Sequence, residues 1–172
     1  MIRPFRFLQI LALCLAPFAF AVSVEAKSFN VRNFGAAGDG TNKDTTAFQK
    51  AFDACKAAGG GTVIVPAGQY LIGSVILSGH TTLRMDSKAN LIGSPDIADY
   101  PLTQVRFEGE FVAGHRALIS AENANGIAIE GGCITGPPLN ISVLRKPRGP
   151  ILIELTGCTN VTLEGFSTKY PH

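Results

Sequence analysis

The sequence has no tryptophan, only four cysteines and little charge. Charged residues make up 16% of the 172 residues, and 15 lysines and arginines against 13 aspartates and glutamates leave a net charge of only +2. A chain that binds nucleic acid through its charge would carry a strong basic excess, and a disordered chain would be poor in apolar residues. Because 46% of the residues are hydrophobic, the composition predicts one globular domain with no nucleic-acid partner.

The few cysteines and histidines do not form a metal-binding motif. Beyond Cys14, which lies in the N-terminal apolar run, the cysteines are Cys55, Cys133 and Cys158, without Cys-x-x-Cys or Cys/His spacing. One disulfide bridge among them is an alternative, but buried free thiols are the favoured interpretation. The three histidines are scattered and are interpreted as surface or core-edge residues: His80, His115 and His172.

The one long apolar run is at the N-terminus, over residues 7–22. Arg3 and Arg6 precede it, and the small residues of a cleavage site follow before Lys27. We therefore expect residues 1–26 to be a signal peptide and residues 27–172 to be a secreted or periplasmic domain.

An uncleaved membrane anchor is the alternative, because the run approaches the ~18 apolar residues of a membrane-spanning helix. Gln9 and Pro17 interrupt the run and favour cleavage. The sequence thus predicts no membrane contact after cleavage.

An amphipathic helix is predicted after residue 44. Apolar residues recur at i, i+3, i+4 and i+7, at Phe48, Ala51, Phe52 and Cys55. Asp44 and Thr45 are alternative N-caps, and the spacing of Thr46 and Gln49 also fits a capping box, so the first helical residue is left open. The glycines 59–61 end the helix.

Short apolar runs of period two follow the helix and predict β-strands. They are residues 62–65, 70–77, 81–85, 90–93, 117–120, 127–131, 151–155 and 161–165. The segments 117–131 and 151–165 align without a gap at an offset of 34 residues, and four residues recur: Leu118, Ile119, Glu130 and Gly131 as Leu152, Ile153, Glu164 and Gly165. This pattern is typical of successive coils of a β-solenoid. Residues 133–150 would then hold the rest of one coil and a projecting loop.

The glycine-rich segment before the helix has two interpretations. A solenoid needs a cover for its first coil, so we interpret "FGAAGDG" as the turn into a capping helix. A calcium or phosphate loop over residues 39–44 is the alternative, but the spacing of a calcium hand and of a P-loop are both missing.

Longer stretches of the sequence resemble the N-terminal third of polygalacturonases. The residues that carry this resemblance are "FNVRNFGAAGDGTNKDTTAFQKAFDACKAAGGGTVIVPAGQYLIGSVIL", "LIGSPDIADYP", "VRFEGE", "ALISAENANGIAIEGGCITG" and "RGPILIELTGCTNVTLEGFS". The resemblance implies an all-β fold, a right-handed parallel β-helix with an N-terminal capping α-helix. It also implies secretion, an acidic polysaccharide partner (pectin or polygalacturonate), and hydrolysis of α-1,4-galacturonide bonds with inversion and without a cofactor or metal.

The family's catalytic motifs do not occur in this sequence. These are an Asn-Thr-Asp segment, an Asp-Asp pair, a Gly-His-Gly and an Arg-Ile-Lys, so the resemblance assigns no catalytic, cofactor-binding or metal-binding residue here. Residues 134–138 also depart from the Ile-Asp-Gly-Gln-Gly-like segment of many relatives. We therefore expect a truncated β-helix that is inactive alone. A non-catalytic module that binds acidic polysaccharide, or a tail-fibre-like module, is the alternative.

Local residues offer weaker candidates. At an offset of 34, Glu130 and Glu164 would point outward on neighbouring strands ~4.7–4.9 Å apart, as an acid/base pair or as two surface residues. The surface interpretation is favoured. The basic segment Arg145-Lys146-Pro147-Arg148 would contact a polyanion or lie in a solvated loop.

The remaining features concern glycosylation and the end of the solenoid. Residues 140–142 and 160–162 fit the glycosylation triplet. Val161, Leu163 and Phe166 would lie at an unpaired edge, so we expect poor solubility.

N-terminal sequencing of the secreted protein tests the predicted signal peptide. We expect the mature chain to begin at Lys27, because the small residues of the cleavage site end at Ala26. Recovery of the intact N-terminus in a membrane fraction would contradict the prediction and support the anchor.

Overall fold

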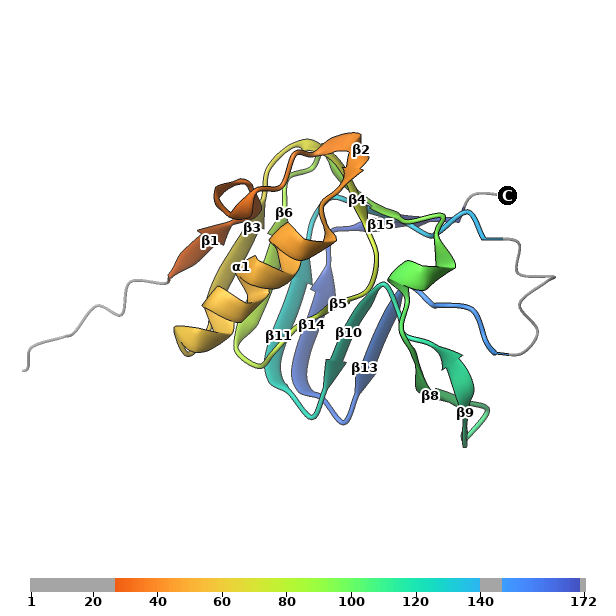
Figure 1. Cartoon of the computed structure of the whole chain (residues 1–172). Helices are drawn as coiled ribbons and strands as arrows, with labels where there is room; N and C mark the ends of the chain where they lie inside the picture. The colour runs from red at the N-terminus through yellow and green to blue at the C-terminus, as the bar shows by residue number, and fades with distance from the viewer. Residues whose placement is uncertain (1–26, 140–146, 171–172) are drawn as a thin grey trace, which may run out of the picture.

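The computed structural model describes residues 27–139 and 147–170, and the predicted signal peptide lies outside them. Parallel strands stack in three rows and form a parallel β-helix, with one α-helix and one antiparallel hairpin beside it (Figure 1). The predicted fold class is thereby confirmed.

Two five-stranded sheets form two sides of each coil. Sheet A has the order β1 (Ser28–Asn30), β3 (Gly61–Val65), β6 (Thr81–Met85), β11 (Asn125–Glu130) and β14 (Thr159–Glu164). Sheet B has the order β2 (Asp39–Lys43), β4 (Gly68–Ile72), β7 (Ala89–Gly93), β12 (Cys133–Thr135) and β15 (Ser167–Lys169). Two 3-10 turns, η1 (Val31–Phe34) and η2 (Ile97–Asp99), lie between strands.

Sheet C is the third side, with the order β5 (Val75–Ile76), β10 (Ile119–Glu122) and β13 (Ile153–Thr156). Beside it the antiparallel hairpin β8 (Leu102–Phe107) and β9 (Glu110–His115) projects from the β-helix (Figure 1). This hairpin was not among the predicted strands, because its residues are mixed polar and apolar.

The predicted offset of 34 residues is the true register between the last two described coils. Ile119 pairs with Ile153 in sheet C, and Ile129 pairs with Leu163 in sheet A, both at the expected offset. The same register stacks apolar side chains inside the helix, because a strand places alternate residues on the same face. Leu83, Ile129 and Leu163 form one such row.

The single strand expected over residues 70–77 is wrong. Residues 68–72 belong to sheet B and residues 75–76 to sheet C, with a corner at Gly73 and Ser74. A Cβ on Gly73 would lie 2.6 Å from the Asp99 backbone oxygen, so only glycine fits there. Thr45 Oγ1 accepts a hydrogen bond from Gly73 N at 2.8 Å and fixes the corner. Apolar periodicity alone does not reveal such a turn.

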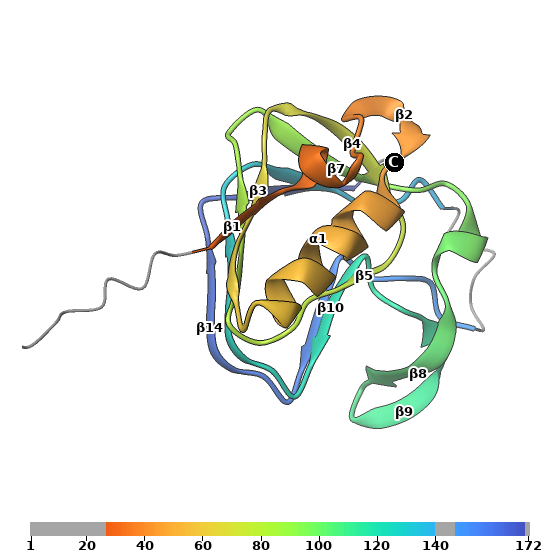
Figure 2. The same ribbon diagram turned by 60° about the vertical axis from the view of Figure 1, so that its left-hand side comes forward.

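Helix α1 (Thr45–Ala57) covers the open end of the first coil, as expected (Figure 2). Its buried face consists of Ala47, Phe48, Ala51, Phe52 and Cys55. The Phe48 ring packs edge-on against Tyr70 of β4 at a centroid distance of 5.4 Å. The helix thus supplies the apolar surface that the first coil lacks on that side.

The ends of α1 confirm one prediction and correct another. Gly59 follows the helix with a φ of 84°, a conformation that glycine adopts without strain, so the glycines do end it. Asp44 occupies the N-cap position, but its side chain makes no capping bond, and Gln49 bonds to Asp53 and to the backbone of Ile76. The capping box expected of Thr46 and Gln49 is therefore wrong, because the N-cap is Asp44 and the Gln49 amide bonds to Asp53 and Ile76.

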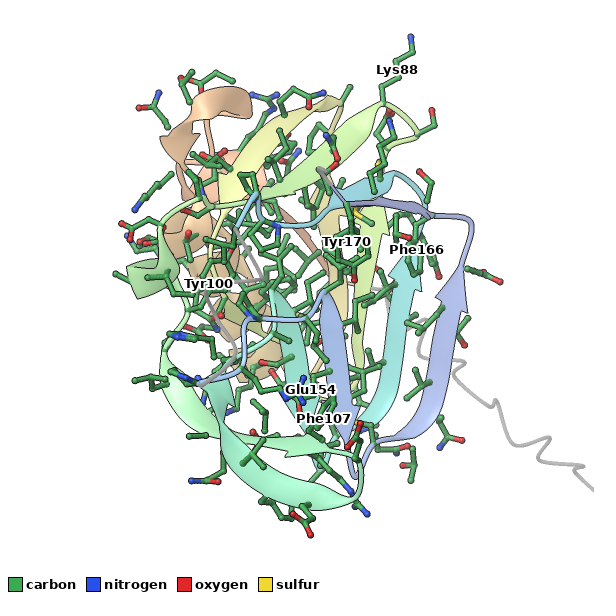
Figure 3. The ribbon with its side chains drawn as sticks, turned by 90° about the vertical axis from the view of Figure 1, so that its right-hand side faces the viewer. Lys88, Tyr100, Phe107, Glu154, Phe166 and Tyr170 are labelled. Atoms are coloured by element: carbon green, nitrogen blue, oxygen red, sulfur yellow. The ribbon has the colours of Figure 1, made fainter. Side chains whose placement is uncertain are left out.

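The last described coil leaves its apolar side chains uncovered. Val161 and Leu163 of β14 are 39% and 46% exposed, whereas their partners Ile127 and Ile129 in β11 are 1% and 0% exposed. Strand β14 is the edge of sheet A, and the half-buried Phe166 follows it (Figure 3). The expected exposed edge is confirmed, and poor solubility stays a prediction.

Two leucines in the same row test the contribution of this stacking. Leu83→Ala should lower the free energy of unfolding by about 3 kcal/mol, because it leaves a cavity in the closed interior. Leu163→Ala should lower it by less than about 1 kcal/mol, because Leu163 is already partly in water. Urea unfolding of residues 27–172 measures both, and equal losses would contradict the fold.

Candidate functional site

A groove runs across the outer face of sheet C. It consists of two adjoining hollows of about 480 and 350 Å³, a size typical of small-ligand sites. The first lies between α1 and the turn that joins β10 to β11, and the second lies between the hairpin and β13. Both are lined by Arg116, Ser120 and Glu122, so the two hollows form one continuous depression.

The register of sheet C builds the floor of the groove. Ser120 of β10 pairs with Ile76 of β5 on one side and with Glu154 of β13 on the other. All three line the groove, so this row faces outward, although Ser120 itself is buried and its hydroxyl donates to the Val75 carbonyl oxygen at 3.4 Å. Neighbouring strands lie ~4.7–4.9 Å apart, and the row therefore places a carboxylate about one strand from the Ser120 hydroxyl.

The capping helix builds one wall. Ile76 N donates to Gln49 Oε1 at 2.9 Å, and Gln49 Nε2 donates to the Ile76 carbonyl oxygen at 3.3 Å. One side-chain amide thus satisfies the free edge of sheet C in the manner of a further strand. Asp53 and Lys56 on the same side of α1 line the first hollow and bring one charge of each sign to it.

The hairpin builds the opposite wall. Phe111 of β9 is 66% exposed and lines the second hollow together with Thr103 and Gln104 of β8. The Arg148 guanidinium lies over the Phe107 ring at 3.1 Å from its centroid, and His115 N donates to the Arg148 carbonyl oxygen at 2.7 Å. These contacts hold the hairpin to the segment that precedes β13.

Arg116 is the central cation of the groove. Both backbone polar groups of Arg116 are hydrogen-bonded. Its N–H donates to the Pro101 carbonyl oxygen at 3.0 Å, and its carbonyl oxygen accepts from Ser74 Oγ at 3.0 Å. Its half-buried side chain makes no ion pair with the residues that the structure describes. A guanidinium in this position can bind a carboxylate with two parallel hydrogen bonds.

The basic segment 145–148 lies only partly within the described residues. Pro147 and Arg148 are described, and Arg145 and Lys146 are not. Arg148 stacks on Phe107, so its guanidinium supports the hairpin. The proposed polyanion contact of this segment stays a prediction.

Glu130 and Glu164 are register partners on the outer face of sheet A, as expected. Arg84 of β6 pairs with Glu130 in the same row, and its Nε donates to Glu130 Oε2 at 2.8 Å. Glu130 therefore has a cationic neighbour as well as a like-charged one. The contacts fit a surface ion pair between strands, and none of Arg84, Glu130 and Glu164 lines the groove.

Of the remaining candidates, those that the structure describes do not line the groove. His115 Nδ1 lies 2.6 Å from the Tyr100 carbonyl oxygen, which makes this nitrogen the hydrogen-bond donor, and His80 is exposed in a turn with a φ of 58°. His172 and the glycosylation triplet 140–142 lie outside the described residues, whereas Asn160 of the second triplet donates to Asn125 Oδ1 at 2.6 Å.

The cysteines in the described segments are free thiols, but only Cys55 is buried as the favoured interpretation expected, whereas Cys133 and Cys158 are half-buried. Cys55 lies on the buried face of α1, and burial raises the pKa of its thiol. Within residues 27–139 and 147–170, no group of three or more His, Cys, Asp and Glu residues is placed to hold a metal ion. No helix in the same ranges is long and apolar enough to cross a membrane.

The carboxylates of the glycine-rich segment are bound to its own backbone. Asp39 accepts hydrogen bonds from the N–H groups of Thr41 and Asn42, which hold the pKa of Asp39 well below its usual range. The buried Asp44 accepts from Ala37 N at 2.7 Å and Gly38 N at 3.0 Å. These bonds shape the turn into α1, which agrees with the structural interpretation over a calcium or phosphate loop.

The fold and the groove define a parallel β-helix of the pectate-lyase-like class. Residues 28–141 match the family model described as rhamnogalacturonase A/epimerase, pectate lyase-like. The chain belongs to this family.

Similar proteins include both hydrolases and epimerases. An exo-poly-alpha-D-galacturonosidase from Dickeya chrysanthemi is 44% identical over 75 residues, which are 44% of this chain and 12% of that protein. Mannuronan C5-epimerase AlgE3 from Azotobacter vinelandii is 46% identical over 66 residues, 38% of this chain and 4% of that protein. A probable polygalacturonase from Vitis vinifera is 33% identical over 126 residues, 67% of this chain and 26% of that protein.

A solved structure agrees with the fold. The family 28 exopolygalacturonase of Yersinia enterocolitica has a TM-score of 0.72 at 26% identity, over 84% of this chain and 35% of that chain. This chain thus spans only about a third or less of these relatives.

Sequence reasoning did not identify the groove or Arg116. The signal was present in the alignment of residues 117–120 with 151–154, which places Ser120 beside Glu154. One wall comes from α1, which was predicted but is distant in the sequence. The other wall comes from the hairpin, which was not predicted.

Asp44→Ala tests whether the glycine-rich segment is a structural turn. The substitution leaves the N–H groups of Ala37 and Gly38 without their acceptor, and should lower the free energy of unfolding by roughly 3 kcal/mol. Asp39→Ala is the matched control on an exposed carboxylate and should cost clearly less. A rise in melting temperature on addition of calcium, lost in either variant, would contradict the structural role.

Proposed function

We propose that this chain is the N-terminal part of a secreted polygalacturonase-like hydrolase, and that its groove binds acidic polysaccharide. The observation that carries the proposal is the position of Arg116, an ion-pairing group with no described acidic partner at the centre of an open groove. The likeness to polygalacturonases supports the substrate class.

An elongated ligand fits the shape of this site. The groove passes from α1 across sheet C to the hairpin, and exposed apolar side chains stand in each of its hollows, Ile76 in the first and Phe111 in the second. A sugar ring has apolar C–H faces and polar edges, so it can pack on an apolar side chain while its carboxylate reaches Arg116.

Hydrolysis itself is proposed for the whole protein. Inverting glycosidases place two carboxyl groups ~6.5–9.5 Å apart, one as the acid and one as the base that activates water. The family's aspartate motifs do not occur among these 172 residues. Residues 27–172 are therefore expected to bind the polymer without cleaving it.

Binding and cleavage are measured on folded residues 27–172, with folding confirmed by circular dichroism. We expect binding of polygalacturonate, which Arg116→Ala weakens by about 10-fold because a charge-assisted hydrogen bond is lost. Arg84→Ala is the matched control, since Arg84 lies on sheet A outside the groove. The reducing-end assay should show no sugar release.

Two results would contradict the proposal. Release of reducing ends by residues 27–172 would place catalytic groups within this chain, with Glu130 and Glu164 the first to substitute. Binding that Arg116→Ala leaves unchanged would remove the groove as the site. A trimer in solution would instead favour the tail-fibre-like alternative.

A further inference from the structure

The two ends of the β-helix differ in how they are covered. Helix α1 covers the first coil and presents a polar outer face, on which Thr46, Lys50 and Asp53 are exposed. At the other end, β13, β14 and β15 are the outermost strands of sheets C, A and B (Figure 1). We call this the open end, and its partly exposed apolar side chains are Ile153, Leu155, Val161, Leu163 and Phe166.

The backbone of β14 has polar groups that point out of the open end. Thr159 N donates to the Ala124 carbonyl oxygen at 2.9 Å, toward the neighbouring strand β11. Alternate residues of a strand direct their backbone groups to opposite sides, so Val161 also bonds toward β11. The N–H and C=O of Thr162 therefore face the free edge of sheet A, where a further strand would satisfy them.

Antiparallel pairing of β14 with β14 of a second copy suits both faces of the strand. With Thr162 opposite Thr162 of the second copy, the two residues exchange both backbone hydrogen bonds. On the inner face Val161 then lies opposite Leu163, so the apolar rows continue from one copy into the other. On the outer face Asn160 lies opposite Glu164, so no carboxylate faces a carboxylate across the pair.

The charges of the open end favour the same orientation. Its three strands carry Glu154 on β13, Glu164 on β14 and Lys169 on β15. A two-fold axis through the middle of β14 turns the sheet B side of one copy onto the sheet C side of the other. Lys169 of each copy is thereby brought to the side on which the other copy carries Glu154. Opposite charges thus meet across the interface.

The covered end does not offer an equivalent partner surface. Head-to-tail stacking would set Val161 and Leu163 against the polar outer face of α1. The first edge of sheet C is also already satisfied, because Gln49 bonds to both backbone groups of Ile76. Two open ends fit each other better than an open end fits a covered one, so the assembly closes at two copies.

We propose that the open end is a homodimer interface, in which β14 pairs antiparallel with β14 of a second copy about a two-fold axis at Thr162. The interface lies on a different surface from the groove and does not rest on the proposed binding function. It covers Val161 and Leu163 and joins the interiors of the two copies.

Cross-linking tests the register of this pairing in residues 27–172. In the dimer the two Thr162 Cα atoms lie about 5.5 Å apart, within the range that a disulfide spans. We expect Thr162→Cys to form a disulfide-linked dimer as its main product under mild oxidation. Thr82→Cys is the matched control, because Thr82 lies in the same outer row two strands away from the open end. It should yield no more linked dimer than the unsubstituted chain, and equal linkage in both variants would overturn the proposal.

Sedimentation tests whether the free edge itself makes the dimer. The mass of residues 27–172 should rise from one copy toward two between about 1 and 300 μM. Thr162→Pro removes an N–H that β11 does not use, so it should keep the circular dichroism of the fold and weaken the dimer at least about 10-fold. A single copy at every concentration, or a series of trimers and larger species, would overturn the proposal.

A charge exchange tests the orientation. Lys169→Glu should weaken the dimer about 3- to 10-fold because it places like charges together, and Glu154→Lys in the same chain should restore it. Neither substitution touches the buried interior, so folding is retained. Failure of the double variant to bind more tightly than Lys169→Glu alone would overturn the two-fold arrangement.

Discussion

The in-register stacking of apolar rows from coil to coil is the interaction on which the whole structure depends. Each strand pairs with its neighbour so that rows such as Leu83, Ile129 and Leu163 continue through the interior. A shift of one residue would turn every inward side chain outward, so the register between coils, 34 residues for the last two described, specifies the inside and the outside together. The groove depends on the same register, because Ser120 and Glu154 face outward between buried residues.

A solenoid must also satisfy its ends, and here that requirement shapes the site. Helix α1 covers the first coil, and Gln49 completes the edge of sheet C through both backbone groups of Ile76. The same helix then contributes Lys56 and Asp53 to the groove. Capping and site formation are thus two results of one packing arrangement.

Periodicity predicted much of the fold, and contacts between distant segments decided the rest. The helix and most strands follow from local pattern, and the offset between residues 117–131 and 151–165 gave the correct pairing. The corner at Gly73 was missed because its cause is the close approach of Asp99, which no local pattern records. Arg116 was missed because its position matters only once α1 and the hairpin enclose it.

The binding site itself is tested most directly by amide chemical-shift mapping of labelled residues 27–172 with an oligogalacturonide. The groove predicts that shifts concentrate at Phe111, Arg116, Ser120 and Glu122, while the outer face of sheet A around Arg84 and Glu130 stays unchanged. Shifts confined to sheet A, or no shifts at ligand concentrations that saturate binding, would contradict the assignment of the groove.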